Sequence, residues 1–169
     1  MAILRITKDG ESVLRERAKE VPLHEIATPK LKQLLQDMLE TMYDANGVGI
    51  AAPQVGVSKR IFIAESGDGP IALINPVFTK KSWKMKRLEE GCLSVPKKYD
   101  KLMRHKSVTV SALTMDGKEV TFTAEDYFAQ VLQHEMDHLD GLLYVDRVRM
   151  QKDDKEKKSG AARKPAAKK

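Results

Sequence analysis

His134, Glu135 and His138 form the pattern H-E-x-x-H within the stretch QHEMDHLDG, residues 133–141. On a helix, residues four apart share a face, so both imidazoles point the same way with a carboxylate beside them. Such a set is typical of hydrolases in which two histidines bind a metal ion. The same spacing also occurs by chance, and buried histidines without a metal need other hydrogen-bond partners. Two ligands do not complete a metal site, so a third is required.

Cys92, the only cysteine of the chain, lies in the stretch LEEGCLSVP, residues 88–96. A lone cysteine is an apolar core residue, a reactive thiol or a metal ligand. The remaining histidines, His24 and His105, lie in charged segments that we expect at the surface. The chain after His138 lacks the third histidine or helical glutamate of the common metallopeptidases. We hypothesise that Cys92 is the third ligand, which leaves a fourth position for water. The alternative is an inert core residue.

An amphipathic helix is predicted in the N-terminal part of the chain, well before Cys92 and His134. Thr28 is a typical N-cap, Pro29 suits the first helical position, and apolar residues then recur on one stripe until Asn46 and Gly47. The stretch that follows, GVGIAAPQVG (47–56), is rich in small residues and predicts a loop.

Short β-branched segments predict antiparallel strands at residues 60–65, 71–78, 107–114 and 119–124, the last two joined by the turn MDGK. Thr123 and Asp126 have capping-box spacing, and they predict a helix that carries H-E-x-x-H and ends at Gly141. The expected fold class is therefore α+β, with antiparallel sheets packed around a central H-E-x-x-H helix and with an N-terminal amphipathic helix.

The 169 residues predict one catalytic domain, residues 1–150, and a flexible basic tail, residues 151–169. From residue 150 onward, eight Lys or Arg stand against three acidic residues, with no apolar periodicity that could bury surface. No apolar run approaches the ~20 residues of a membrane span, and the first residues have neither the apolar core of a signal peptide nor the charge pattern of a transit peptide. We expect a cytoplasmic protein with neither a membrane nor DNA as a partner.

Three stretches in order, GVGIAAPQ (47–54), EGCLS (90–94) and QHEMDH (133–138), resemble the motifs G-x-G-x-A-A-x-Q, E-G-C-x-S and H-E-x-x-H of the peptide deformylases. The similarity extends loosely over residues 3–148 and excludes the tail. It departs at Lys97 and His105, in segments that bear on substrate preference. The resemblance implies hydrolysis of the N-terminal formyl group of newly made proteins, with release of formate.

The resemblance also implies the roles of the residues. Cys92, His134 and His138 would bind the metal, which lowers the pKa of its bound water towards 7. Glu135 would be the general base and then the acid that protonates the leaving nitrogen. The metal implied is Fe²⁺, with Zn²⁺, Ni²⁺ or Co²⁺ as substitutes.

Two donors implied for the oxyanion are the side-chain amide of Gln54 and the backbone N–H of Leu93. The substrate is an N-formylmethionyl peptide, so a slot for the methionine side chain is needed as well as backbone pairing. We assign substrate binding to residues that flank the three motifs, namely Val48, Gly49, Leu88, Glu90, Gly91, Tyr127 and Val131.

Two other functions stay open at this point. A zinc peptidase of the H-E-x-x-H type would cleave unformylated peptides internally, and a non-enzymatic ribosome-binding protein would not need Glu135. The basic tail is a solvated extension in the plain interpretation, and in the sharper one it contacts ribosomal RNA through its lysines and arginines.

Overall fold

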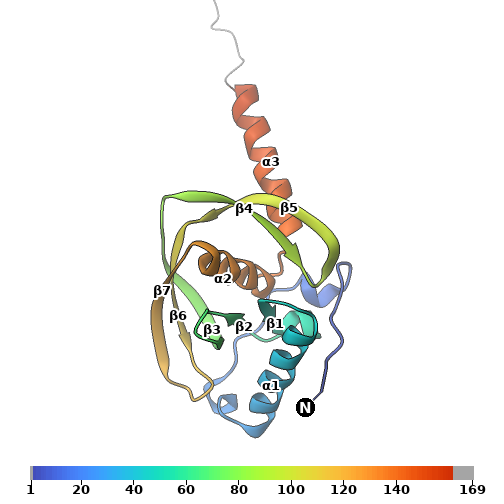
Figure 1. Cartoon of the computed structure of the whole chain (residues 1–169), viewed down its shortest axis with the longest axis vertical. Helices are drawn as coiled ribbons and strands as arrows, with labels where there is room; N and C mark the ends of the chain where they lie inside the picture. Colours follow the sequence, from blue (N-terminus) through green and yellow to red (C-terminus); the bar gives the residue numbers. More distant parts are fainter. Residues whose placement is uncertain (1, 162–169) are drawn as a thin grey trace, which may run out of the picture.

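The computed structural model describes residues 2–161 and combines three α-helices with two antiparallel sheets (Figure 1). The α+β class with antiparallel sheets is therefore confirmed. The elements are α1 (Pro29–Asp44), β1 (Gly49–Ala51), the 3₁₀ helix η3 (Ala52–Val55), β2 (Ile61–Glu65), β3 (Pro70–Lys81), β4 (Met85–Cys92), β5 (Val95–His105), β6 (Ser107–Leu113), β7 (Glu119–Glu125), α2 (Asp126–Leu139) and α3 (Tyr144–Ala161).

Helix α1 starts where its capping residues predict. The Thr28 hydroxyl accepts a hydrogen bond from the backbone N–H of Leu31, and Pro29 occupies the first turn. One face of the helix, including Met38 and Met42, is fully buried against β1 and β2. Each such side chain contributes roughly 1.5–3 kcal/mol by leaving water, so α1 anchors the strand that forms one wall of the site.

The larger sheet has five strands in the order β1-β2-β3-β6-β7, all antiparallel to their neighbours. Its register shifts between Ile74 and Val77 in β3, where Pro76 has no N–H to donate. The predicted strands at 60–65, 71–78, 107–114 and 119–124 correspond to β2, β3, β6 and β7. The segment 47–56 differs from the expected loop because it contains β1 and η3.

The second sheet is a ribbon of β4 and β5, which the sequence patterns did not predict. Its strands are rich in lysine and glutamate and poor in β-branched residues, so they lack the usual strand composition. Pairing between them and packing of inward residues such as Leu102 hold the ribbon together. Because β4 ends at Cys92, this ribbon delivers the sulfur to the site.

Helix α2 lies between the five-stranded sheet and the β4–β5 ribbon (Figure 1), and it carries His134, Glu135 and His138. Its start differs from the predicted capping box. Thr123 is still in β7, and Glu125 at the N-cap makes no side-chain capping bond. The strand ladder with β6 continues to Glu125, so pairing in the sheet prevails over the local capping signal.

Helix α3 continues through Ala161. The composition had instead predicted a flexible tail from residue 151 onward. Lysine, glutamate, glutamine and alanine favour helix strongly, and the lack of an apolar stripe indicates only that this helix is exposed. Gln151 also bonds the backbone of β5, donating to Met103 O at 2.9 Å and accepting from Met103 N at 2.8 Å. The expected tail residues 162–169 lie outside the described residues.

No helix among residues 2–161 combines the length and the apolar character needed to cross a membrane.

Candidate metal centre and active site

Cys92, His134 and His138 converge although they lie on two elements far apart in the sequence. One ligand atom of each lies within 4.8 Å of the others. The Sγ of Cys92 is 3.2 Å from Nε2 of His138, and the rings of His134 and His138 have centroids 5.0 Å apart. The tight turn between β4 and β5, with Cys92 opposite Val95, holds the sulfur above the helix.

These donors fit a divalent metal ion. In a tetrahedral site the nitrogen and sulfur ligands are about 3.5 Å apart, given bond lengths of roughly 2.0–2.3 Å. The Nδ1 of His134 is 2.9 Å from a carboxylate oxygen of Glu90, which directs its other nitrogen to the cluster. Three donors leave a fourth position for water or substrate, as in catalytic sites.

A buried ionic network fixes the His134 ring. Both carboxylate oxygens of Glu90 accept from the guanidinium of Arg104, at 2.7 and 2.9 Å, and one of them also faces His134. Arg104 donates to Asp137 as well, at 2.7 Å. Asp137 lies in the same helix as His134. The network therefore ties β4, β5 and α2 together at the level of the metal ligands.

The same contacts shift the ionisation of the site. Burial alone would raise the pKa of Glu90, but hydrogen bonds from Arg104 and His134 outweigh it and lower the pKa to about 2. Burial lowers the pKa of His138 well below its usual value, and the neighbouring His134 adds to this. A carboxylate that stays ionised and an imidazole that stays neutral are the forms that a metal site needs.

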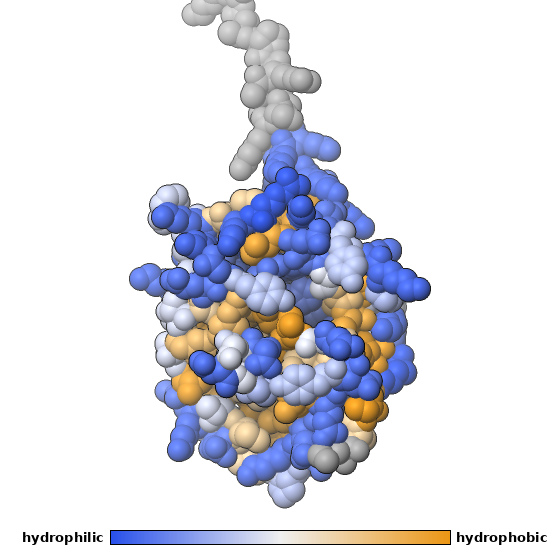
Figure 2. Space-filling model, in the orientation of Figure 1, coloured by the Kyte–Doolittle hydropathy of each residue, from blue (hydrophilic) through white to orange (hydrophobic). Residues whose placement is uncertain are grey.

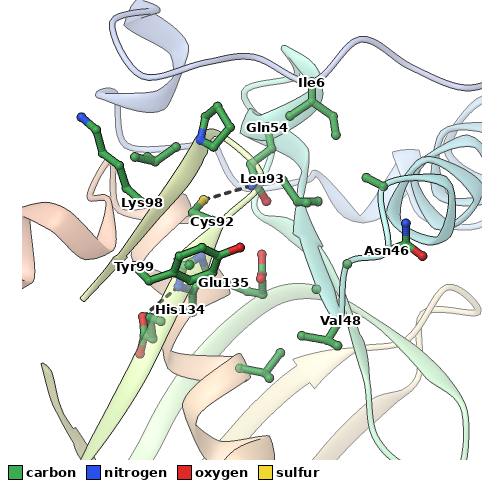
Figure 3. Close-up of a pocket in the computed structure, with 18 of the residues that line it drawn as sticks. Ile6, Asn46, Val48, Gln54, Cys92, Leu93, Lys98, Tyr99, His134 and Glu135 are labelled. Atoms are coloured by element: carbon green, nitrogen blue, oxygen red, sulfur yellow. Dashed lines mark hydrogen bonds and ion pairs between the residues drawn. The ribbon is translucent and has the colours of Figure 1, made fainter. Parts of the chain in front are cut away.

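Glu135 lies beside the cluster, with its side chain directed into the cavity (Figure 3). The residue is 3% exposed, and burial raises the pKa of its carboxyl to about 7. Its Oε2 has no hydrogen-bond partner among residues 2–161. A carboxyl with a pKa near neutrality can both accept and release a proton at physiological pH.

Gln54 lies on η3, and its side chain points towards the sulfur of Cys92 (Figure 3). Its Nε2 donates to Ser94 Oγ at 3.2 Å and lies 3.5 Å from Cys92 Sγ, while its Oε1 accepts from Ala51 N at 2.8 Å. The amide is thus held in one orientation, with its donor end towards the cluster. Leu93, next to Cys92, also lines the cavity.

The sequence of this chain is similar to those of known proteins. The profile of the family described as "Polypeptide deformylase" matches residues 3–154. The chain belongs to the peptide deformylase family. It is 50% identical to the peptide deformylase of Halothermothrix orenii over 150 residues, which are 88% of this chain and 95% of the relative.

Solved deformylases share the fold of this one. The structure from Thermotoga maritima has a TM-score of 0.83 at 42% identity, covering 87% of this chain and 98% of that one. A class I type b deformylase from Acinetobacter baumannii, described as bound to Met-Ala-Ser, has a TM-score of 0.83 at 38% identity, covering 86% and 98%.

In this deformylase two of the metal-ligand candidates, Cys92 and His134, line a cavity of about 630 Å³. Figure 2 shows a hollow on this face with hydrophobic surface inside it and hydrophilic side chains around it. The cavity lining includes most of the residues assigned to substrate binding from the sequence, namely Val48, Gly49, Glu90, Gly91, Tyr127 and Val131. Val48 and Tyr127 are 42% and 61% exposed, so they lie at the rim.

The structure places two of those residues differently from the others. Leu88 is not among the residues that line the cavity of this deformylase, since it lies further along β4. Glu90 does line the cavity, but Arg104 and His134 already use its carboxylate, which leaves it to orient the metal ligand rather than a substrate.

Sequence reasoning missed several residues that the fold brings to the site. Ser94 anchors Gln54, and its place in the EGCLS stretch could have indicated this. Arg104 and Tyr99 gave no such signal because they lie in the unpredicted strand β5. Gln130 lies in α2 four residues before His134, so its helical spacing could have indicated it. The Nε2 of Gln130 donates to Glu89 O at 2.7 Å and so joins α2 to the ribbon.

Proposed function

We propose that this chain removes the formyl group from N-formylmethionyl peptides of newly made proteins, by hydrolysis to formate and a free amine. The observation that carries the proposal is the convergence of Cys92, His134 and His138, together with the buried carboxylate of Glu135, which lines the same cavity as Cys92 and His134. Membership of the deformylase family supports the same reaction.

Cys92, His134 and His138 would hold the metal ion, and iron(II) is the ion that we propose, with zinc, nickel or cobalt as substitutes. Thiolate and imidazole donors suit all of these ions. When bound, a divalent ion supplies a nucleophile at neutral pH by lowering the pKa of bound water. The hydrogen bond between Glu90 and His134 would keep that histidine in the tautomer that ligation requires.

Glu135 would move the proton. In our proposal its carboxylate accepts a proton from the attacking water and then donates one to the nitrogen that leaves, so the C–O bond forms and the C–N bond breaks without net loss of a proton from the site. Its pKa of about 7, caused by burial, suits both halves of this task. Proton transfer of this kind contributes typically ~10²–10⁴-fold to the rate.

Gln54 and the backbone N–H of Leu93 would stabilise the oxyanion of the tetrahedral intermediate. The Gln54 side chain accepts from Ala51 N and donates to Ser94 Oγ, so its amide is held with the donor end towards the metal ligands. Removal of one such donor typically costs ~100- to 1,000-fold in rate.

The peptide would bind across the mouth of the cavity. We propose that Val131 and Tyr127 on α2, with Val48 at the opposite rim, enclose the methionine side chain. Gly49 and Gly91 also line the cavity, and their missing side chains make room for Glu135 and Tyr99, respectively. An extended peptide backbone would pair with the strands that carry these glycines. The related deformylase bound to Met-Ala-Ser supports a peptide of this length as a probe.

The catalytic unit would be residues 1–150, working in the cytoplasm, and the basic segment 151–169 would contact ribosomal RNA. Truncation after Asp154 retains the bonds between Gln151 and Met103 and so tests the segment beyond. Salt-sensitive ribosome binding that survives this truncation unchanged would refute the RNA contact.

The main test is formate release from formyl-Met-Ala-Ser by protein loaded with iron(II) in the absence of oxygen. Activity in the native protein, absent in both Glu135→Gln and Cys92→Ala, is expected. Metal analysis separates the two variants, because Glu135→Gln should retain the ion and Cys92→Ala should lose it. Internal cleavage of unformylated peptides would favour a zinc peptidase, and full formate release by Glu135→Gln would refute the assigned role of that carboxylate.

A further inference from the structure

A second cavity, of about 370 Å³, lies on the other side of α2 from the metal ligands. Gln133, Met136 and Asp137 of α2 line it together with Asp140, the C-cap of this helix, whereas Tyr127, Gln130, Val131 and His134 line the first cavity. Its remaining walls come from β3, the end of β5 and the base of α3, which Figure 1 shows around this helix. Arg104 and Asp137 in its lining belong to the network that holds His134, and the proposed reaction assigns no role to its other lining residues.

The lining of this cavity is strongly cationic. Five of its residues are Lys or Arg, namely Arg17, Arg60, Lys81, Arg104 and Arg147, while its carboxylates are those of Asp137 and Asp140. Both carboxylates are already used, since Asp137 accepts from Arg104 and Arg147, and Asp140 accepts from Arg60. Positive charge therefore exceeds negative charge in a confined space, which favours an anion.

Several donors in the cavity have weak partners or none. The Arg60 side chain is only 7% exposed. Its Nη1 binds Leu139 O and Asp140, but its Nη2 reaches only the Met136 sulfur, at 3.6 Å. A thioether is a weak acceptor. A buried guanidinium edge that faces a sulfur atom leaves strong hydrogen-bonding capacity unused.

The other cations add to this surplus. Arg147 binds Asp137 through Nε and Nη2, which leaves its second terminal nitrogen without a partner among residues 2–161. Arg17 likewise has no hydrogen bond or ion pair within the described chain. Lys81 lies 5.2 Å from the centre of the Phe78 ring, a contact that keeps its ammonium group over the cavity wall. Arg104 is fully occupied by Glu90 and Asp137 and forms the floor.

The rest of the wall is apolar. Phe78, Met85, Met103 and Met136 contribute an aromatic ring and three thioethers. Methionine side chains adapt their shape to what they contact. The volume corresponds to roughly a dozen water molecules at ~30 Å³ each, which suits a small organic molecule and excludes a nucleic acid strand inside the cavity.

The geometry points to a binding site for a small organic oxyanion, a phosphate monoester or carboxylate attached to an apolar or aromatic group, in the cavity behind α2. The oxyanion accepts from Arg17, Arg147 and Lys81 and from the free edge of Arg60, because planar guanidinium groups match phosphate and carboxylate oxygens. The apolar group rests against Phe78 and the methionines. This site is separate from the cavity that holds Glu135.

The test uses the full-length, zinc-loaded protein labelled with ¹³C at the methionine methyl groups, titrated with phenyl phosphate at low salt. Met85, Met103 and Met136 report on the proposed cavity. Gly47 lines the first cavity, and Met42 lies beside Gly47. Met42 therefore reports on binding near the metal. Inorganic phosphate and phenylacetate are titrated in parallel to separate phosphate from carboxylate recognition and to measure the contribution of the ring.

We expect saturable shifts of the three cavity methionines and no comparable shift of Met42. Arg17→Ala and Lys81→Ala should each weaken binding about two- to fivefold, since both cations are exposed, and Lys81→Glu should weaken it more. Lys118→Ala, at an exposed turn outside both cavities, is the matched control and should leave the affinity unchanged.

Two results would overturn the proposal. One is the absence of saturable shifts at Met85, Met103 and Met136 with all three probes. The other is equal weakening by Lys118→Ala and Lys81→Ala, which would show that only the overall charge matters. Because Arg17 and Lys81 are surface residues, their variants fold, and a negative result counts against the site rather than against the fold.

Discussion

Substitution of Gly49 by alanine should disable catalysis while sparing the fold. Gly49 lies in β1 and faces Glu135. A Cβ added at this position would lie 2.3 Å from Oε1, 2.8 Å from Cδ and 3.0 Å from Cγ of Glu135. The backbone φ of Gly49 is not positive, so alanine can adopt it without strain. All three nearest atoms belong to the Glu135 side chain, so this side chain must move.

The size of the effect follows from that distance. Ordinary contacts begin near 3.4 Å, so the carboxylate must retreat by about 1 Å. A misplacement of about 1 Å can cost roughly 100-fold in rate, which equals about 2.7 kcal/mol of transition-state stabilisation. The free energy of unfolding should change by less than about 1 kcal/mol, because a Gly→Ala change also reduces the entropy of the unfolded chain.

The assay is kcat/KM for formate release from formyl-Met-Ala-Ser, with metal content and thermal unfolding measured on the same sample. We expect kcat to fall about 100-fold, with metal content and Tm close to those of the native protein. A double-mutant cycle supplies the control. On a Glu135→Gln background, Gly49→Ala should add little, since the group that it displaces no longer transfers protons.

The reasoning would be refuted by a Gly49→Ala variant with kcat/KM within threefold of native. It would also be refuted if the losses from Gly49→Ala and Glu135→Gln simply added, because the glycine would then act on something other than the glutamate.

Three further predictions concern the support of the site. Ser94→Ala removes the 3.2 Å hydrogen bond to Gln54, so kcat should fall about tenfold at unchanged metal content, given that a donor lost outright costs ~100-fold or more. Arg104→Ala removes the cation shared by two buried carboxylates, which leaves Glu90 with His134 and Asp137 with Arg147 as partners. It should lower the free energy of unfolding in urea by ~3–5 kcal/mol, whereas Lys86→Ala, at an exposed ion pair, should cost less than ~1 kcal/mol. Truncation before Gln151 removes its two bonds to β5 and should cost ~1–3 kcal/mol, while truncation after Asp154 should leave Tm unchanged.

Each of these predictions has an outcome that contradicts it. Native kcat in Ser94→Ala would mean that Gln54 needs no anchor. Equal losses in Arg104→Ala and Lys86→Ala would mean that the buried network contributes no more than a surface ion pair. Equal Tm values for the two truncations would mean that α3 does not stabilise β5.

Local patterns in the sequence determined a large part of this protein. Thr28 and Pro29 marked the start of α1, short β-branched segments marked β2, β3, β6 and β7, and the spacing of His134 and His138 placed both imidazoles on one face of α2. These features depend on residues close together in the chain, where helical and strand periodicities apply directly.

The tertiary structure decided what no local pattern contains. The β4–β5 ribbon, built from charged segments, brings Cys92 to within 3.2 Å of His138 and places Arg104 against Glu90 and Asp137. The capping box at Thr123 failed because strand pairing extends to Glu125, and residues 151–161 are helical because exposed Lys-rich sequence still favours helix.

The physical reason is that the sequence specifies the types of the ligands and their local spacing, but no local pattern specifies which distant residues come together in space. Two histidines four residues apart are positioned by one helix, so the sequence alone suffices for them. The sulfur, the Gln54 amide and the Glu90 carboxylate reach the same point only after strands distant in sequence have paired and packed, and that arrangement results from the burial of side chains throughout the molecule.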